Sequence, residues 1–285
     1  MGLWRFLFVL IWAASNAIPL HKYKRLSHDT LILGERPHPR NVTRSVRGYM
    51  FLHLDHDSEL ALAQKDLPPP VGKKLHFNKR TRSVARNQCA HPIAEGAVWK
   101  TSHGYFINAH NSQGLSSIFI ETAVQRAFRR WACVVNGPGV ERLVIGPLLG
   151  VRLDKNGDSI RHDSPDGFNE IGFAQINGKP GTIGLTVLWG DFEGSHPELV
   201  EFDMMFDQAH YRFGNSSEVR GVIDFEATAT HEAGHAHGLD DIYEDSCSDV
   251  TMFATSNIDE TKKRTLEQAD IDGVFQMYEQ VTNKK

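Results

Sequence analysis

One stretch decides the fold, and it runs His231-Glu-Ala-Gly-His235-Ala-His-Gly-Leu-Asp-Asp241. In a helix, residues four apart lie one turn apart on the same face, so His231 and His235 can direct two imidazoles at a single ion. Glu232 follows the first histidine directly and lies beside that ion instead of on it. The spacing therefore predicts a helix that binds a metal.

The ends of this helix indicate where a third ligand comes from. Asp224 can cap the start of the helix, and Gly238 can end it by adopting a positive φ angle. A sharp turn at Gly238 brings the following residues back under the metal, which makes Asp241 the predicted third ligand and Asp240 the alternative. His237 lies roughly 240° round the helix from the first histidine at about 100° per residue, so we do not expect it to bind.

These residue types suit zinc hydrolysis of peptide bonds. A zinc ion with three protein ligands keeps a fourth position for water, and a nearby carboxylate can take the proton of that water as it attacks a polarised carbonyl. Glu232 is the predicted general base. His-Glu-x-x-His also arises by chance, but here it extends to a turn glycine, a third ligand and Met252, eleven residues further on.

The extended motif, with Cys247-Ser-Asp-Val-Thr-Met252-Phe after it, resembles the metzincin metalloproteases and within them the matrixins. Three other stretches are similar to matrixin segments: Ala127-Phe-Arg-Arg-Trp131, Leu199-Val-Glu-Phe-Asp203 and residues 265–278. The resemblance covers roughly residues 95 to 280.

The resemblance implies an α+β fold with a twisted, mixed five-stranded sheet, three helices, an active-site helix and Met252 in a turn beneath the zinc. It also implies that residues 182–189 form an edge strand that pairs with extended substrate, which is a way to bind peptides with little sequence preference. Asp241 departs from the family, because matrixins usually have histidine as the third ligand.

The pattern of the surrounding chain agrees with this fold. Apolar residues at helical spacing predict a helix over 120–131. The capping-box pattern Thr265-Leu-Glu-Gln268 predicts a last helix that buries Ile271, Val274, Phe275 and Tyr278. Strands are predicted at 99–108, 143–153, 171–176, 182–189 and 199–206.

Further metal sites are weakly indicated. The structural zinc of vertebrate matrixins is matched only faintly by His162-Asp163 and Asp166-Gly167, and we expect a polar loop there. Residues 154–158 alternate oxygen ligands as a calcium loop does, but Ser159 replaces the loop glycine and Pro165 stands where an EF-hand has its Glu. We expect a solvated turn, with a loose calcium site as the alternative.

Three cysteines, Cys89, Cys133 and Cys247, allow at most one intramolecular disulfide. Matrixin zymogens place a pro-region thiolate on the zinc, but Asn87-Gln-Cys-Ala-His-Pro92 lacks the rest of that motif. We therefore expect a disulfide from Cys89 to Cys247 or Cys133, and a cysteine switch is the alternative.

The front of the chain has the pattern of a secretory signal over residues 1–17, in which Arg5 precedes nine apolar residues and Ser15-Asn-Ala17 offers a cleavage site. Nine apolar residues are less than half of the roughly 20 that a spanning helix needs, so we expect secretion without membrane insertion. The predicted division is a signal peptide at 1–17, a basic pro-region at 18–88 and a catalytic domain at 89–285.

Charge separates the last two parts. Residues 18–88 hold 14 Lys and Arg against 6 Asp and Glu, whereas residues 89–285 hold 16 against 29. We expect the basic segment to dock on the acidic domain, and the alternative is a basic arm that contacts polyanions. Its periodicity is strand-like only at 49–54. Arg44, Arg47, Lys79-Arg80, Arg82 and Arg86 are candidate cutting points.

The sequence thus favours a secreted endopeptidase with one catalytic zinc, acting on protein or peptide substrates and with no nucleic-acid partner. The alternative is a zinc-stabilised extracellular binding protein without turnover. Glu232 favours the enzyme, because a general base has no purpose where only binding is needed. Substrate preference stays open, since residues 253–264, the expected specificity loop, are simply polar and charged.

Overall fold

The computed structural model describes residues 17–27, 29–57, 89–93, 96–136, 145–150, 160–177, 181–193 and 197–282. The apolar run of the signal, the cutting points from Lys79 to Arg86 and the candidate calcium loop lie outside these residues. No helix in the described part is long and apolar enough to cross a membrane.

The described strands that follow Cys89 include the five-stranded mixed sheet that the resemblance implied. Its strands are β5 (His103–Ile107), β6 (Ile145–Gly150), β7 (Glu170–Asn177), β8 (Thr182–Asp191) and β9 (Glu198–Asp207). They lie in the order β8-β9-β7-β5-β6. Only β8 runs antiparallel to its neighbour within this group, so the sheet is mixed as predicted.

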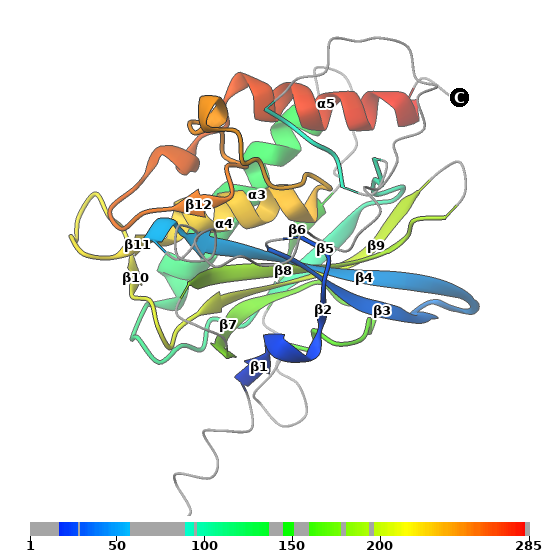
Figure 1. Ribbon diagram of the computed structural model, residues 1–285, viewed down its shortest axis with the longest axis horizontal. Helices are drawn as coiled ribbons and strands as arrows, with labels where there is room; N and C mark the ends of the chain where they lie inside the picture. The colour runs from blue at the N-terminus through cyan, green and yellow to red at the C-terminus, as the bar shows by residue number, and fades with distance from the viewer. Residues whose placement is uncertain are drawn as a thin grey trace, which may run out of the picture.

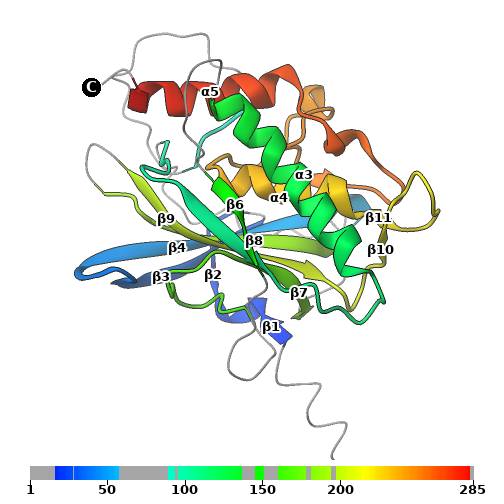
Figure 2. The same cartoon turned by 180° about the vertical axis from the view of Figure 1, so that it is seen from behind.

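Three helices cover one face of the sheet (Figures 1 and 2). They are α3 (Ser117–Asn136), α4 (Phe225–Ala236) and α5 (Gln268–Thr282). The predicted apolar stripe of α3 is buried against the sheet and α4, with Trp131 inaccessible to solvent. The arrangement is the α+β metzincin and matrixin fold, and α4 carries the His-Glu-x-x-His motif in its core.

The N-terminal segment extends this sheet, which the sequence did not predict beyond residues 49–54. Its strands are β1 (Ala17–Pro19), β2 (Lys24–Arg25), β3 (Thr30–His38) and β4 (Asn41–Asp55). Strand β4 pairs antiparallel with β8, from Arg47 opposite Gly190 to Leu54 opposite Thr182. The expectation that 182–189 forms an edge strand is therefore wrong for the full chain.

Strand β4 can lie inside the sheet because its apolar residues point to both faces, as in strands buried on two sides. Tyr49 and Phe51 join the core beneath the helices, whereas Met50, Leu52 and Leu54 join a second core on the opposite face. Ile18 of β1 and Leu31 and Leu33 of β3 complete that second core. Strand β1 lies on the side of the sheet away from the helices (Figure 1).

Shorter elements connect these strands and helices. They are η1 (Leu20–Lys22), β10 (Phe213–Gly214), β11 (Ile223–Asp224), η2 (Asp245–Cys247), β12 (Thr255–Ser256) and η3 (Lys262–Arg264). Strand β12 pairs in parallel with the end of β4. Strand β4 thus lies between β8 and β12 where it passes α4.

The last helix differs from its prediction in two ways. It begins at Gln268, because Asp270 accepts the amides of Thr251, Met252 and Glu267 and so fixes the first turn there. Thr265 is outside the helix. Phe275 is 45% exposed, and Met277 is buried in its place beside Val274 and Tyr278.

Candidate metal centre

Helix α4 begins and ends as the sequence predicted. The Asp224 carboxylate accepts the amide of Ala227 at 2.9 Å and also the Nε of Arg264 at 2.8 Å. This cap satisfies an amide that the first turn would otherwise leave without a partner. Gly238 adopts φ 99° just after the helix, so the chain turns back toward the two histidines.

The two histidines are held in a fixed orientation by backbone carbonyls. The Nδ1 of His231 lies 2.8 Å from the carbonyl oxygen of Thr251, and the Nδ1 of His235 lies 2.9 Å from that of Leu239. A ring that donates from Nδ1 has its Nε2 lone pair available for a metal. Both Nε2 atoms are buried without a hydrogen-bond partner.

Asp241 completes the group. Its Oδ1 lies 3.3 Å from the Nε2 of His231 and its Oδ2 lies 3.4 Å from the Nε2 of His235. Ligands about 2.05 Å from a tetrahedral ion are separated by about 3.3 Å, so these spacings fit zinc. Both carboxylate oxygens are buried and without a hydrogen-bond partner. Four such atoms around one point are the donor set that a cation would satisfy.

The structure places the two weaker candidates away from this point. Asp240 accepts the amide of Asp241 at 3.0 Å. The Nδ1 of His237 bonds to the Ala233 carbonyl at 2.6 Å, and its ring stacks on Trp131. Asp241 is therefore the geometrically favoured third ligand, and its binding of zinc stays a prediction.

Electrostatics agree with a cation between these side chains. Burial lowers the pKa of His231 to about 4. Burial opposes the charged form of His235 as well, but the Asp241 carboxylate outweighs it and raises the pKa of His235 to about 9. A cation bound here would replace that proton, so binding should strengthen as pH rises.

Glu232 is placed to act as a base. Its Oε2 accepts the hydroxyl of Thr186 on β8 at 2.6 Å, whereas its Oε1 is buried without a partner. Burial raises the pKa of Glu232 to about 7. A Cβ atom at position 184 would lie 3.2 Å from Oε1, so Gly184 keeps space open beside this oxygen.

Met252 lies directly under the motif. A Cβ atom at Gly234 would collide with its sulfur, so the glycine within the motif allows Met252 to approach α4 closely. Asp270 holds the amides of Thr251 and Met252 at 2.9 and 3.2 Å. The turn at residues 251 and 252, beneath the histidines, is thus hydrogen-bonded to α5.

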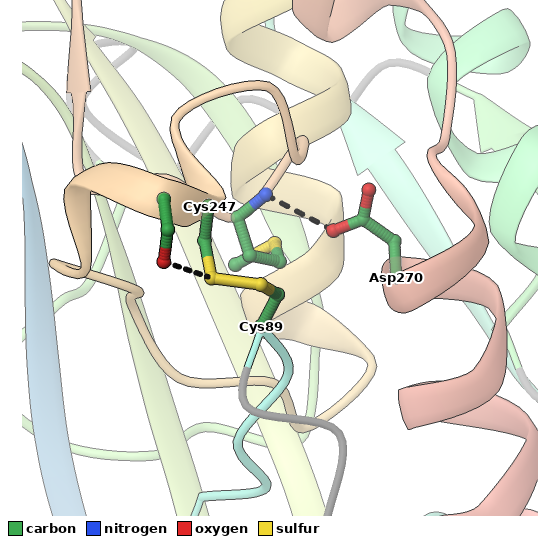
Figure 3. The surroundings of a disulfide bond; sticks show 5 residues. Cys89, Cys247 and Asp270 are labelled. Atoms are coloured by element: carbon green, nitrogen blue, oxygen red, sulfur yellow. Dashed lines mark hydrogen bonds between the residues drawn. A yellow bond between two sulfur atoms is a disulfide. The ribbon is translucent and has the colours of Figure 1, made fainter.

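A disulfide joins Cys89 to Cys247 next to this turn (Figure 3). Their Cα atoms are 5.4 Å apart, and Asp270 lies nearby with its bond to the backbone. This is one of the two pairings that the sequence allowed, and Cys133 is exposed with a free thiol. Because the Cys89 sulfur is bonded to Cys247, it cannot act as a thiolate on the metal.

Sequence reasoning missed the side chains that β4 and its neighbour bring to the site. The ring of His53 lies 3.9 Å from that of His231, and the ring of Phe51 lies 4.9 Å from that of His235, measured between centroids. The carboxyl of Asp29 is buried close to that of Asp241, and burial together with the charge of Asp241 raises the pKa of Asp29 well above its usual range. The strand-like pattern at 49–54 indicated a strand here, but not that it would lie beside the motif.

Within the described residues, two overlapping groups of side chains could hold a metal ion. One is His231, His235 and Asp241, and the other is His53, His231 and Glu232. The loop at 162–167 forms no such group among these residues. Its Asp166 and Gly167 amides donate instead to the carboxylate of Glu201.

Comparison with known proteins agrees with this fold and site. Residues 171–279 match the family model of the matrixins. The chain is also 27% identical over 172 residues to Metalloendoproteinase 1-MMP of Arabidopsis thaliana, which is 59% of this chain and 40% of that relative. The chain therefore matches less than half the length of this relative. Together with the sheet, helices and α4 motif, these findings support a matrixin-like catalytic domain.

Proposed function

We propose that this chain is a secreted zinc-dependent endopeptidase that is made as a latent precursor. The observation that carries the proposal is the convergence of His231, His235 and Asp241 on one point, with Glu232 beside it and its Oε1 without a partner. A purely structural metal site needs the three ligands but has no need of the Glu232 carboxylate. The matrixin match supports the same activity.

The ligands would be the Nε2 atoms of the two histidines and the carboxylate of Asp241. Zinc, when bound, supplies a Lewis acid that polarises a peptide carbonyl and makes water more acidic. Glu232 would remove the proton of the attacking water through Oε1 and deliver it to the leaving amine. Thr186 keeps the carboxylate oriented through Oε2 for these transfers.

We also propose that residues 18–88 act as a pro-region. Its β4 pairs with β8 on one side and β12 on the other, which is the way an extended substrate would be held beside α4. Arg44 forms an ion pair with Asp191, and Arg47 lies 3.7 Å from Glu193. These pairs are exposed and weak, so apolar burial provides most of the attachment.

Cutting between Lys79 and Arg86 followed by release of β4 would free the edge of β8 for substrate. Arg44 and Arg47 are less suitable cutting points, because both belong to β4 itself and Arg47 pairs with Gly190 of β8. The disulfide supports export, since such bonds persist in oxidising compartments. The signal-like residues 1–17 are consistent with that route.

The test uses the full chain, cut by limited trypsin treatment and checked by mass spectrometry for cleavage between residues 79 and 86. Peptide hydrolysis and zinc content are measured for the parent, for Glu232→Gln and for the exposed control Glu218→Gln. We expect the parent and control to cleave, and Glu232→Gln to bind zinc but lose at least about 100-fold in rate.

The binding-protein alternative predicts a different result. If the cut parent separates from its N-terminal fragment, binds zinc and hydrolyses no peptide of a broad library, the chain is a zinc-stabilised binder. If Glu232→Gln retains the parent rate, another group is the base.

A further inference from the structure

Lys263 of η3 is fully buried next to the candidate metal centre. Its ammonium donates to the carbonyl oxygen of Phe253, and within the described residues this is its one hydrogen-bond acceptor. An ammonium has three donors, and lysine is almost never fully buried unless it is paired. The Lys263 side chain therefore lacks acceptors in the precursor.

The positive charge of Lys263 affects the titration of histidines at the candidate metal centre. Burial is the largest cause that lowers the pKa values of His231 and His53, and the Lys263 ammonium lowers both further. Helix α4 and η3 pack against each other, so the segment that carries Lys263 lies against the helix that carries His231. Lys263 therefore belongs to the immediate surroundings of the metal centre.

His53 of β4 is the second histidine on which the Lys263 charge acts. Its Nε2 lies 2.9 Å from the hydroxyl of Ser256, and its Nδ1 is buried without a partner. Phe253, whose carbonyl holds Lys263, and Ser256 are three residues apart in the segment that ends in β12. The imidazole and the hydroxyl are thus in contact, and the ammonium is held by the same segment and acts on the imidazole through its charge.

A substrate that replaces β4 would present one side chain where His53 now lies, opposite Gly184 of β8. A glutamate there has about the length of histidine, and its carboxylate can accept from both the Ser256 hydroxyl and the Lys263 ammonium. Burial lowers the pKa of Lys263 to about 7, and an incoming carboxylate would favour its charged form. A leucine would leave a buried ammonium short of acceptors, which is costly.

We infer that Lys263 determines substrate specificity: the pocket that His53 vacates takes an acidic side chain, glutamate above all, next to the bond that is cleaved. This inference rests on the proposed function, because it names the substrate class of the same site. Glu260, Asp241 and Glu232 also favour the charged form of the ammonium. Glu260 is engaged by Lys262 at 3.5 Å and by the Asn257 amide, and a zinc ion held by Asp241 beside Glu232 would offset the charge of the other two.

The experiment profiles a peptide library with the full chain after the trypsin cut described above. The parent should prefer Glu at one of the two positions flanking the cleaved bond by at least about 10-fold in kcat/KM over Leu. Lys263→Met should lose this preference and favour apolar residues. Lys262→Met is the matched control, since Lys262 is the neighbouring lysine with a 37% exposed side chain, and it should keep the preference.

The results distinguish whether Lys263 sets the preference for an acidic side chain. A parent that cleaves with an apolar preference at both flanking positions overturns the inference by itself, without any variant. Retention of the acidic preference in Lys263→Met, with normal zinc content, overturns it as well. If Lys263→Met does not fold, Lys263→Gln and Lys263→Arg replace it, and only the arginine variant should keep the preference. A parent with zinc but no cleavage would count against the proposed function instead.

Discussion

His53 and His231 lie ring against ring, with their centroids 3.9 Å apart. The first belongs to a strand near the start of the chain and the second opens the metal motif on α4. Because β4 also pairs with β8 and β12, this contact places an internal strand across the site where a peptide would have to bind.

Replacing His53 with alanine should loosen β4 without altering the metal ligands. The variant loses a buried ring and its bond to Ser256, which should cost about 2 to 4 kcal/mol of the full chain's free energy of unfolding. A chelator should then remove zinc faster from the uncut chain. His56→Ala is the control, since His56 is exposed just beyond β4. Equal chelation rates for both variants would show that His53 does not hold β4 over the site.

Asp241→Asn should weaken zinc binding by at least about 100-fold, because the amide is a poorer ligand than the carboxylate and carries no charge. Asp240→Asn is the matched control, as Asp240 is half-buried in the same loop but contacts the amide of its neighbour. Zinc content after dialysis against a weak chelator measures the difference. Loss of zinc in Asp240→Asn but not in Asp241→Asn would reverse the ligand assignment.

Cys89→Ser should lower stability but leave the precursor latent. The disulfide closes a separation of 158 residues, and its loss should cost about 2 to 5 kcal/mol, seen as a lower Tm under non-reducing conditions. Latency should persist because β4, and not a thiolate, covers the site. Spontaneous peptidase activity in this variant, absent from Cys133→Ser, would point to a cysteine switch after all.

Glu201 should make the full chain less stable as pH rises. Burial raises its pKa to about 8 in the folded chain, above the ordinary value near 4.5 that it has when unfolded. The folded form therefore holds the proton more tightly, so stability is greatest below the unfolded pKa and falls as pH rises from about 5 to 8. One proton limits the slope to about 1.4 kcal/mol per pH unit. Urea unfolding of Glu201→Gln should give a flatter pH profile, and an unchanged slope would exclude Glu201 as its source.

Local rules predicted the helix that carries the candidate metal ligands and the turn that follows it. The positions of Asp224, Gly238 and Asp241 follow from capping, from the φ freedom of glycine and from helix periodicity, all of which act over a few residues. The apolar stripe of α3 was equally visible. In α5, Asp270 is also engaged by the turn at residues 251 and 252, and a contact from a distant segment overrides a local capping pattern.

The contribution of the N-terminal segment could not be predicted in the same way. Which strand pairs with β8 depends on partners more than a hundred residues away, and the pattern at 49–54 indicates a strand but not its neighbour. The burial of Lys263 likewise arises from packing of η3 on α4, and a run of three basic residues gives no hint of it.

Peptide hydrolysis and the release of the N-terminal fragment should be followed together while the zinc-loaded full chain is cut. We expect no hydrolysis before the cut, and a rate that rises in step with the loss of β4 from the complex in the parent but not in Glu232→Gln. Complete release of the fragment from a folded, zinc-bound parent with no hydrolysis would contradict the proposed function.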